Sequence, residues 1–404
     1  MSAVPDDGAE LLTSDGVGAL LSAAVAHASG VLVDWSLEHV DSNPNRSTTA
    51  TYGAIVDWPF GRREELLGVS ARAHGLSASD TRAEIFADGD REVAVWLYPN
   101  DPDLPGLARA AYPASMAEIL NAAHLADPAL TADDLDLEMI AYRPRRRAVL
   151  RVSARETVYF VKVLRATLSD QIVQRHTLLT DAGVPAPLIA ARTDDHVVVL
   201  RALPGRPLAR AVFDHEPPCT AEQLIAVLDA MPAAVAALER RPPWTDAVDH
   251  YSRIIATALP REEERLHWLV RQIQAGLSGI PAGHEPTHGD FHEGQVHVAD
   301  GRVAGILDID TIGPGRRADD LACLIAHLST IQRMNTEQTA RVHALLRAWV
   351  PVFDQRVDPI ELRLRAAAVV ISLATGPYRG QEPQWERETA WMLDSAEALV
   401  RQVQ

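Results

Sequence analysis

Apolar and polar residues alternate in a regular way along the first hundred positions of the chain. An apolar stretch with helical spacing covers residues 11–28. After it come runs rich in β-branched residues, which predict four strands, at 31–40, 48–56, 64–73 and 93–98. The pattern therefore predicts a separate β-rich subdomain over residues 1–100, which we expect to serve as a cap.

Residues 101–203 predict a second small sheet, which follows a linker rich in Asp and Pro. One helix is expected at 115–124, and another at 168–181 should end at Gly183, because glycine accepts the left-handed backbone that closes helices. Five short apolar or alternating runs predict strands, at 135–142, 148–153, 157–164, 188–192 and 196–200. The order is three strands, one helix and two strands.

Residues 204–404 follow a short hinge and are almost entirely helical in pattern. The one expected exception is a short hairpin, with strands at 296–298 and 303–307. The chain is therefore predicted to be α+β, with a cap over 1–100, a small lobe over 101–203 and a mostly α-helical lobe over 204–404.

Charge and targeting signals narrow the classes of partner. The formal net charge is -17, which argues against nucleic acid or an anionic membrane and fits a neutral or cationic small molecule. No apolar run reaches the roughly 18 residues of a membrane span, and the acidic start lacks a signal-peptide pattern, so we expect a cytoplasmic protein. Cys219 and Cys323 are expected to be buried structural thiols.

Candidate chemistry gathers at the predicted hairpin. The His-Gly-Asp tripeptide at 288–290 precedes it, and Gln295 and Asp308 stand at its two ends. Because a hairpin brings its ends side by side, these two side chains can converge as the hard-oxygen ligands that Mg²⁺ prefers. Asp290 suits a base that deprotonates an attacking hydroxyl in phosphoryl transfer. Asp310 is open to three interpretations: a second metal ligand, an acceptor contact or a turn-capping carboxylate.

These motifs resemble those of the aminoglycoside phosphotransferase-like kinases, over residues 135–330 by motif and elsewhere by element order. The resemblance implies a protein-kinase-like two-lobed fold, here with an extra N-terminal β-rich cap and a mostly α-helical C-lobe. It also implies ATP and Mg²⁺, with Asp290 as the catalytic base and Asp308 as a metal ligand. The Asp-Leu-Ala at 320–322 matches the family's next helix, whereas Gln295 stands where the family usually has Asn.

The nucleotide side of the resemblance rests on three positions. Lys162 is the only lysine in a chain with 38 Lys and Arg residues, and it lies in the third strand of the lobe, where kinases hold the Lys that pairs the α- and β-phosphates. Adenine is expected against the hinge, at Arg201 and Leu203. The helix at 168–181 lacks the usual Glu partner for this Lys. The basic turn at 143–147 either reaches the triphosphate or is a solvated hairpin tip.

The acceptor is expected between Asp290 and the helical lobe. Tyr378, Trp385 and Glu386 are candidates, because sugars commonly stack on aromatic rings and an amine needs a carboxylate. A capped helix start explains the same segment equally well. His297 is a further acceptor candidate, with a buried structural His as the alternative.

The predicted function is ATP-dependent phosphorylation of a small sugar or amino sugar. The Gln-Val-His at 295–297 and the Leu-Asp-Ile-Asp at 307–310 look most similar to bacterial glucosamine kinases, which implies glucosamine 6-phosphate as the product, and next to maltokinases. The alternatives are a maltokinase, an aminoglycoside phosphotransferase that confers resistance, and a non-catalytic nucleotide-binding regulator. The protein is expected to be a monomer or a homodimer.

Overall fold

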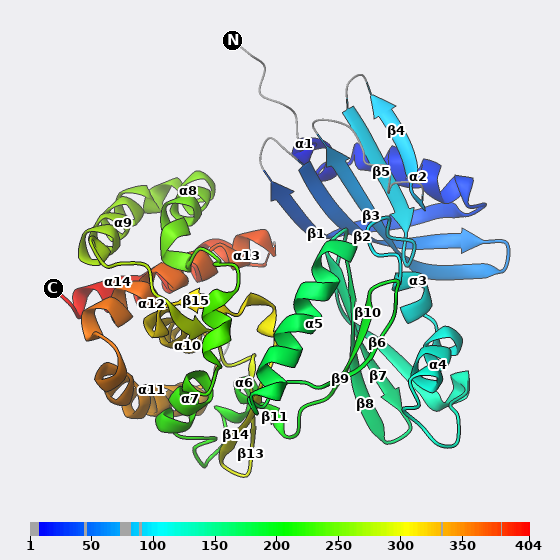
Figure 1. Cartoon of the computed structure of the whole chain (residues 1–404). Helices are drawn as coiled ribbons and strands as arrows, with labels where there is room; N and C mark the ends of the chain where they lie inside the picture. Colours follow the sequence, from blue (N-terminus) through cyan, green and yellow to red (C-terminus); the bar gives the residue numbers. More distant parts are fainter. Residues whose placement is uncertain (1–7, 44–46, 73–81, 89–90, 333, 381) are drawn as a thin grey trace. The chain divides into compact units, whose positions relative to one another are not determined.

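The computed structural model of the chain describes residues 8–43, 47–72, 82–88, 91–332, 334–380 and 382–404. The fold is α+β, as predicted, and its elements form two compact units (Figure 1). Unit 1 comprises Met1–Val173 and Ile189–Ala202, and unit 2 comprises Gln174–Leu188 and Leu203–Gln404. In the part of the chain that the structure describes, no helix is both long enough and apolar enough to cross a bilayer.

The N-terminal part of unit 1 is an antiparallel sheet with the strand order β1-β2-β3-β5-β4. Its strands are β1 (Val31–Asn43), β2 (Ser47–Trp58), β3 (Gly61–Arg72), β4 (Glu84–Asp88) and β5 (Arg91–Leu97). One face buries Tyr52, Leu67 and Val95 against Leu21 of helix α2 (Val17–His27), which lies along the sheet in Figure 1. This face is a hydrophobic core of its own, so the β-rich N-terminal region was correctly predicted.

Two details of this region differ from the predictions. The expected helix over 11–28 is broken into α1 (Ala9–Leu12) and α2. The break occurs where the hydroxyls of Thr13 and Ser14 donate to the backbone carbonyls of Ala9 and Leu11, bonds that compete with helix continuation. The short edge strand β4 was not predicted, and Ala73, the expected end of the third strand, lies outside the described residues.

The second sheet of unit 1 has the strand order β6-β7-β8-β10-β9. Its strands are β6 (Leu135–Arg143), β7 (Arg147–Ala154), β8 (Thr157–Leu164), β9 (Ile189–Arg192) and β10 (Val197–Arg201). Helices α3 (Leu107–Ala110) and α4 (Pro113–Ala122) cover one face. On the other face, Ile172 of α5 (Ala166–Asp181) packs against Val198 and Leu200. All five strands were predicted from their apolar pattern.

The turn between β6 and β7 joins the two sheets of unit 1. The carboxylate of Asp101 is buried and accepts hydrogen bonds from the backbone N–H of Arg145, from the Tyr142 hydroxyl and from the backbone N–H of Asp103, each at 2.8 Å. The Trp96 indole of β5 donates to the Tyr142 hydroxyl at 2.8 Å, and the Arg145 guanidinium lies 5.1 Å from the Trp96 ring centroid.

The predicted alternatives for the basic turn are therefore both wrong for Arg145. Its side chain is neither a solvated tip nor free for a triphosphate, because it is buried against Trp96 and pairs with Asp103. Arg146 pairs with Asp41 of β1 at 2.6 Å. The turn attaches the first sheet to the second.

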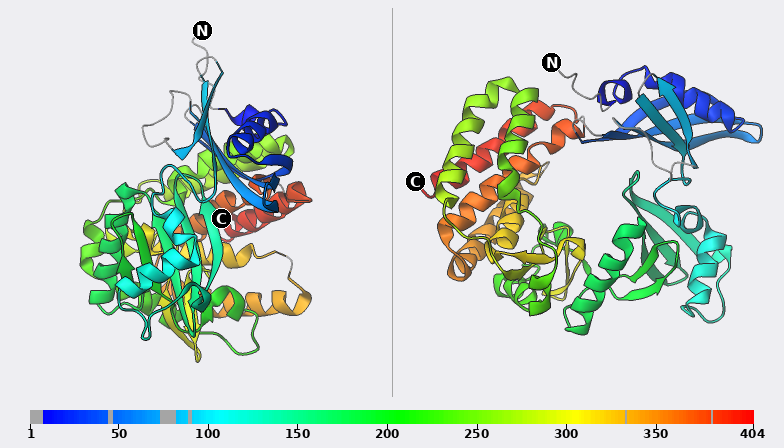
Figure 2. Two further views of the ribbon diagram at one scale, coloured as in Figure 1. Left: turned by 90° about the vertical axis from the view of Figure 1, so that its right-hand side faces the viewer. Right: turned by 45° about the horizontal axis from the view of Figure 1, so that its top comes forward.

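Unit 2 is mainly helical and is built around α12 (Pro359–Leu373), most of whose residues are buried. Helix α12 packs against α8 (Val248–Ala258), α9 (Glu263–Leu277), α10 (Arg317–Ser329) and α14 (Trp385–Arg401). These helices form the bundle drawn from green to red in Figure 2. The remaining helices are α6 (Leu208–Ala211), α7 (Ala221–Asp229), α11 (Thr336–Arg356) and α13 (Gly376–Arg379).

The prediction of a single hairpin in this helical region was incomplete. The hairpin exists as β13 (Val296–Ala299) and β14 (Arg302–Ile306), and β11 (Arg206–Pro207) adds a third strand to it. A separate pair forms between β12 (Glu285–Thr287) and β15 (Gly313–Gly315). Segments of three residues with no apolar alternation carry too little pattern to be recognised as strands.

We expect Asp101→Ala to destabilise unit 1. Three donors would lose their buried acceptor, and each unsatisfied buried donor costs about 1–3 kcal/mol, so the free energy of unfolding should fall by about 3 kcal/mol or more. Urea unfolding followed by tryptophan fluorescence measures this change. The exposed Asp133→Ala is the control, expected within about 0.5 kcal/mol of wild type. Equal stability of the two variants would contradict the role of Asp101.

Candidate active site

The β13–β14 hairpin brings the predicted metal ligands together. Its turn uses Asp300 and Gly301, both with positive φ, and its register places Val296 opposite Ile306. One step further, the backbone N–H of Leu307 donates to the Gln295 carbonyl at 2.7 Å. Asp308 follows Leu307 directly, so that Gln295 and Asp308 lie near each other at the open end of the hairpin.

Asp308 adopts a backbone conformation that is uncommon outside glycine. Its φ is 47° and its ψ is 48°, in the left-handed region, and it precedes the 3-10 turn η6 (Ile309–Thr311). Asp tolerates this region better than most residues, and such conformations gather at functional sites. The turn redirects the chain between β14 and β15.

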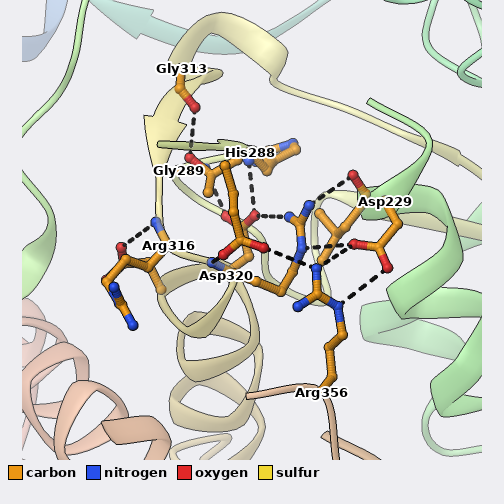
Figure 3. A network of polar contacts seen from close by, with 12 residues as sticks. Asp229, His288, Gly289, Gly313, Arg316, Asp320 and Arg356 are labelled. Carbon is orange, nitrogen blue, oxygen red and sulfur yellow. Dashed lines mark hydrogen bonds and ion pairs between the residues drawn. The ribbon is translucent and has the colours of Figure 1, made fainter. Parts of the chain in front are cut away.

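The loop that carries Asp290 is held by the carboxylate of Asp320, which is fully buried in α10. One oxygen accepts the backbone N–H of His288 at 3.0 Å, and the other accepts that of Gly289 at 2.9 Å (Figure 3). The Thr311 hydroxyl donates to the His288 carbonyl at 2.6 Å. Gly289 has a φ of 81°, and a Cβ there would lie 2.8 Å from the Thr311 carbonyl oxygen, so glycine is required.

An ion network whose central pair, Arg317 and Asp320, is buried supports this loop. Burial raises the pKa of Asp320, and the Arg317 guanidinium, 2.8 Å away, opposes that shift. Arg317 also contacts Asp229 at 3.2 Å, and Arg356 pairs with Asp229 at 3.0 Å (Figure 3). Each buried charge in this network thus has an opposite charge beside it.

Asp290 lies beside side chains of α10. Its carboxylate oxygen is 3.9 Å from the Cys323 sulfur, and this oxygen, the sulfur and a ring nitrogen of His327 all lie within 4.8 Å of one another. Burial raises the pKa of the Cys323 thiol, so the thiol stays protonated next to the carboxylate. Asp290 itself is half-buried, in a position to meet both solvent and a ligand.

Two histidines and one glutamate adjoin Asp290. The rings of His292 and His327 stack with centroids 4.1 Å apart, and each Nδ1 lies 3.7 Å from the buried Oε2 of Glu293. Burial opposes a charge on His292, but the Glu293 carboxylate outweighs it and raises the pKa of His292. Burial and the neighbouring His292 lower the pKa of His327 to about 4. Although burial alone would raise it, contact with His292 lowers the pKa of Glu293.

A cavity of about 400 Å³ opens next to this cluster, entirely within unit 2. Its lining comes from α10, α12, α13, α14 and the segments beside them: Glu293, His327, Thr330, Ile331, Gln332, Leu373, Gly376, Pro377, Glu382 and Met392. Two carboxylates are present, and the described residues of the lining include neither Lys nor Arg. The cavity therefore favours a neutral or cationic ligand.

Gln295 and Asp308 have the donor chemistry of a magnesium site. The Gln295 amide nitrogen lies 3.2 Å from His292 Nε2. For the amide oxygen, the described residues offer no hydrogen-bond partner, so this oxygen is available to a cation. An amide oxygen and a carboxylate match Mg²⁺, which usually takes one or two protein carboxylates and completes its shell with water and phosphate.

The other predicted residues fall in different places. Lys162 is buried in the middle of β8, and Arg201 is the last residue of β10, both in unit 1. Leu203 begins a segment of unit 2 and lies next to Gly305 of β14. Asp310 is buried in η6 of unit 2.

The predicted acceptor residues lie outside the lining of the cavity. Tyr378 and Trp385 form an edge-to-face pair at 5.0 Å, Glu386 pairs with Arg261 at 3.1 Å, and His297 Nδ1 lies 3.2 Å from the Pro204 carbonyl oxygen. The segment that carries Tyr378, Trp385 and Glu386 does reach the cavity, but through other residues, which include Glu382.

Glu293 and His327 were not predicted at all. Helical spacing could have pointed to His327. It lies one turn after Cys323 and two turns after Asp320, so all three lie on the same face of α10.

Comparisons with known proteins agree with the kinase-like motifs. A model of the phosphotransferase enzyme family matches residues 141–357. Among solved structures, a ligand-free thermostable mutant of aminoglycoside phosphotransferase APH(4)-Ia is 15% identical, covering 66% of this chain and 94% of that one, with a TM-score of 0.45.

Two other solved structures are similarly distant. An ethanolamine kinase from Plasmodium vivax is 11% identical, covering 72% of this chain and 90% of that one, with a TM-score of 0.46. Macrolide 2'-phosphotransferase MphH from Brachybacterium faecium is 17% identical, and the match covers 69% of this chain and 98% of that one, with a TM-score of 0.41. A search of curated proteins finds no match. Likenesses this loose do not decide the substrate.

We expect Asp320→Ala to loosen the loop that carries Asp290. Two backbone N–H groups and the Arg317 guanidinium would lose a buried acceptor, and breaking a buried pair in this way costs about 3–5 kcal/mol of unfolding free energy. Urea unfolding measures the loss. Asp394→Ala, which removes an exposed carboxylate 2.7 Å from Arg265, is the control and should cost at most about 1 kcal/mol. A loss in the Asp320 variant as small as in the control would refute the anchoring role.

Proposed function

This chain belongs to the phosphotransferase enzyme family, and from its site we propose that it transfers the γ-phosphoryl group of ATP to a hydroxyl of a small amine-bearing sugar. Glucosamine is the first candidate, with glucosamine 6-phosphate as the product. One observation carries the proposal: the Asp290 carboxylate lies within 4.8 Å of a ring nitrogen of His327, and His327 lines the acidic cavity. A base and an acceptor pocket thus adjoin.

The proposed chemistry needs little from the protein besides positioning and charge. Asp290 orients the acceptor hydroxyl and takes its proton as the oxygen bonds to the γ-phosphorus and ADP leaves. Gln295 and Asp308 would hold Mg²⁺, which when bound neutralises the phosphate oxygens of the nucleotide. Asp320 keeps the loop of Asp290 in place through two backbone hydrogen bonds.

For the nucleotide we propose the roles that the family resemblance implies. Lys162 would bind the α- and β-phosphates, and the backbone at Arg201 and Leu203 would contact the adenine. The support is that Lys162 is the only ammonium side chain in the sequence, and that it is buried within a strand. Asp310 remains a candidate for a second metal contact, because it lies two residues after Asp308.

The acidic lining of the cavity supports an amine-bearing acceptor. The cavity contains the carboxylates of Glu293 and Glu382 and, among its described lining residues, no basic side chain except His327, whose lowered pKa keeps it neutral. Tyr378 and Trp385 flank the same segment and could support a sugar ring, whereas Glu386 is engaged by Arg261.

The acidic lining of the cavity also ranks the alternative functions. An aminoglycoside also carries amines and hydroxyls and stays as the second candidate. Maltose has no amine and gains nothing from the two carboxylates. A non-catalytic regulator would not need a base next to an acceptor cavity.

The first test is a screen for ADP release with Mg²⁺-ATP and a panel of acceptors: glucosamine, glucose, maltose and kanamycin. We expect turnover with the amine-bearing acceptors and a drop of about 10²–10⁴-fold in kcat for Asp290→Asn, because a positioned base contributes that much. ADP affinity of the variant, measured by calorimetry, should stay near the wild-type value. Turnover in the variant at the wild-type rate would eliminate Asp290 as the base.

A second test concerns specificity. Glu293→Gln keeps the shape of the side chain and removes its charge, so kcat/KM for glucosamine should fall about 10–100-fold, the loss expected for a charge-assisted hydrogen bond, with a smaller change for glucose. Glu386→Gln is the matched control, because this glutamate is exposed and outside the cavity lining. A parallel fall for both sugars would show that Glu293 does not recognise the amine.

A further inference from the structure

Asp290, Cys323 and His327 bring three different metal-binding atoms together beside the acceptor cavity. A carboxylate oxygen of Asp290 lies 3.9 Å from the Cys323 sulfur, and both atoms lie within 4.8 Å of a ring nitrogen of His327. Cys323 and His327 are one helical turn apart on α10, whereas Asp290 comes from the loop that Asp320 holds. Two separate elements thus place an oxygen, a sulfur and a nitrogen close together.

The mixed donor set selects the class of metal. Zn²⁺ binds carboxylate oxygen, thiolate sulfur and imidazole nitrogen at about 2.0–2.3 Å, so neighbouring ligands of a tetrahedral zinc lie roughly 3.3–3.6 Å apart. The 3.9 Å between Asp290 and Cys323 is close to that spacing, and small side-chain rotations close the remaining gap. Mg²⁺ instead prefers oxygen ligands in an octahedron, which fits Gln295 and Asp308 and not this set.

The surroundings fit a bound metal in two further ways. Metal-binding histidines usually have a carboxylate neighbour that orients the ring, and Nδ1 of His327 lies 3.7 Å from Oε2 of Glu293. An ion also has a path to the buried Cys323, because His327 lines the cavity and Asp290 is half-buried. The cavity has room for the water that completes a zinc site with three protein ligands.

A second group of candidate ligands, His292, Glu293 and His327, shares one histidine with the first. Its two imidazole rings are stacked 4.1 Å apart with an angle of 7° between their planes. Their in-plane lone pairs therefore run side by side and do not converge on one ion. His292 is also engaged elsewhere, because its Nδ1 accepts the Gly294 N–H at 3.1 Å. We therefore place the metal in the first group.

We propose that Asp290, Cys323 and His327 bind Zn²⁺ or a similar thiophilic divalent cation, and that the bound ion inhibits phosphoryl transfer. Binding breaks the S–H bond of Cys323 and forms a metal–sulfur bond, and the thiol proton passes to solvent. With its carboxylate on the metal, Asp290 no longer accepts the proton of the acceptor hydroxyl. The inhibition rests on the proposed function, whereas the binding of the metal does not.

Metal binding is measured on chelator-treated protein without nucleotide, in millimolar Mg²⁺, by competition with a chromogenic zinc chelator. Cys323→Ala removes the sulfur and should weaken Zn²⁺ binding at least about 100-fold, since even the partners that orient a ligand contribute about 10–100-fold. Cys219→Ala is the matched control. Cys219 is the other buried cysteine and lies outside both ligand groups, so this variant should bind zinc as the wild type does.

Co²⁺ supplies a spectroscopic signature of the sulfur ligand. The thiolate-to-cobalt charge-transfer absorption should appear in the wild-type protein and in Cys219→Ala, and it should be missing in Cys323→Ala. In the ADP-release assay, zinc should inhibit the wild type and Cys219→Ala at concentrations at which Cys323→Ala keeps its own zinc-free rate.

Two results overturn the metal site: equal zinc affinity in Cys323→Ala and the wild type, and a wild-type cobalt complex without the thiolate absorption. Inhibition that persists in Cys323→Ala overturns the inhibitory role, because the inhibiting ion then lies elsewhere. If Cys323→Ala fails to fold, as judged by its thermal midpoint, His327→Gln gives the same comparison of zinc affinity. Zinc binding that depends on Cys323, in a protein that turns over no acceptor, supports the site and counts against the proposed function alone.

Discussion

The buried carboxylate of Asp320 is the interaction on which the candidate site depends. It accepts the backbone N–H groups of His288 and Gly289, so the loop before Asp290 is attached to helix α10. An ionised carboxylate without water is costly, and Arg317 at 2.8 Å compensates it. The position of the proposed base thus follows from one ion pair that the packing of α10 keeps dry.

The hairpin β13–β14 supplies the second constraint. Its register sets Gln295 beside Leu307, and the left-handed backbone of Asp308 then turns the chain into η6. The Thr311 hydroxyl at the end of that turn reaches back to the His288 carbonyl. The loop of the proposed base and the turn of the proposed metal ligand are therefore coupled by hydrogen bonds between them.

Charge placement separates the supporting structure from the reactive one. Buried guanidiniums such as Arg317 and Arg365 are matched by carboxylates and stabilise the fold. The Glu293 carboxylate in the cavity wall instead lies beside two imidazoles, those of His292 and His327.

The sequence alone determined the α+β class, the strands of the second sheet and the β13–β14 hairpin, because alternation and turn residues are local properties of neighbouring residues. Only the tertiary structure decided the β12–β15 pair, the burial of Arg145 and the acidic cavity. Those features join segments that lie far apart in the chain, and which side chains meet there depends on how α10, α12 and α14 pack, which no local pattern encodes.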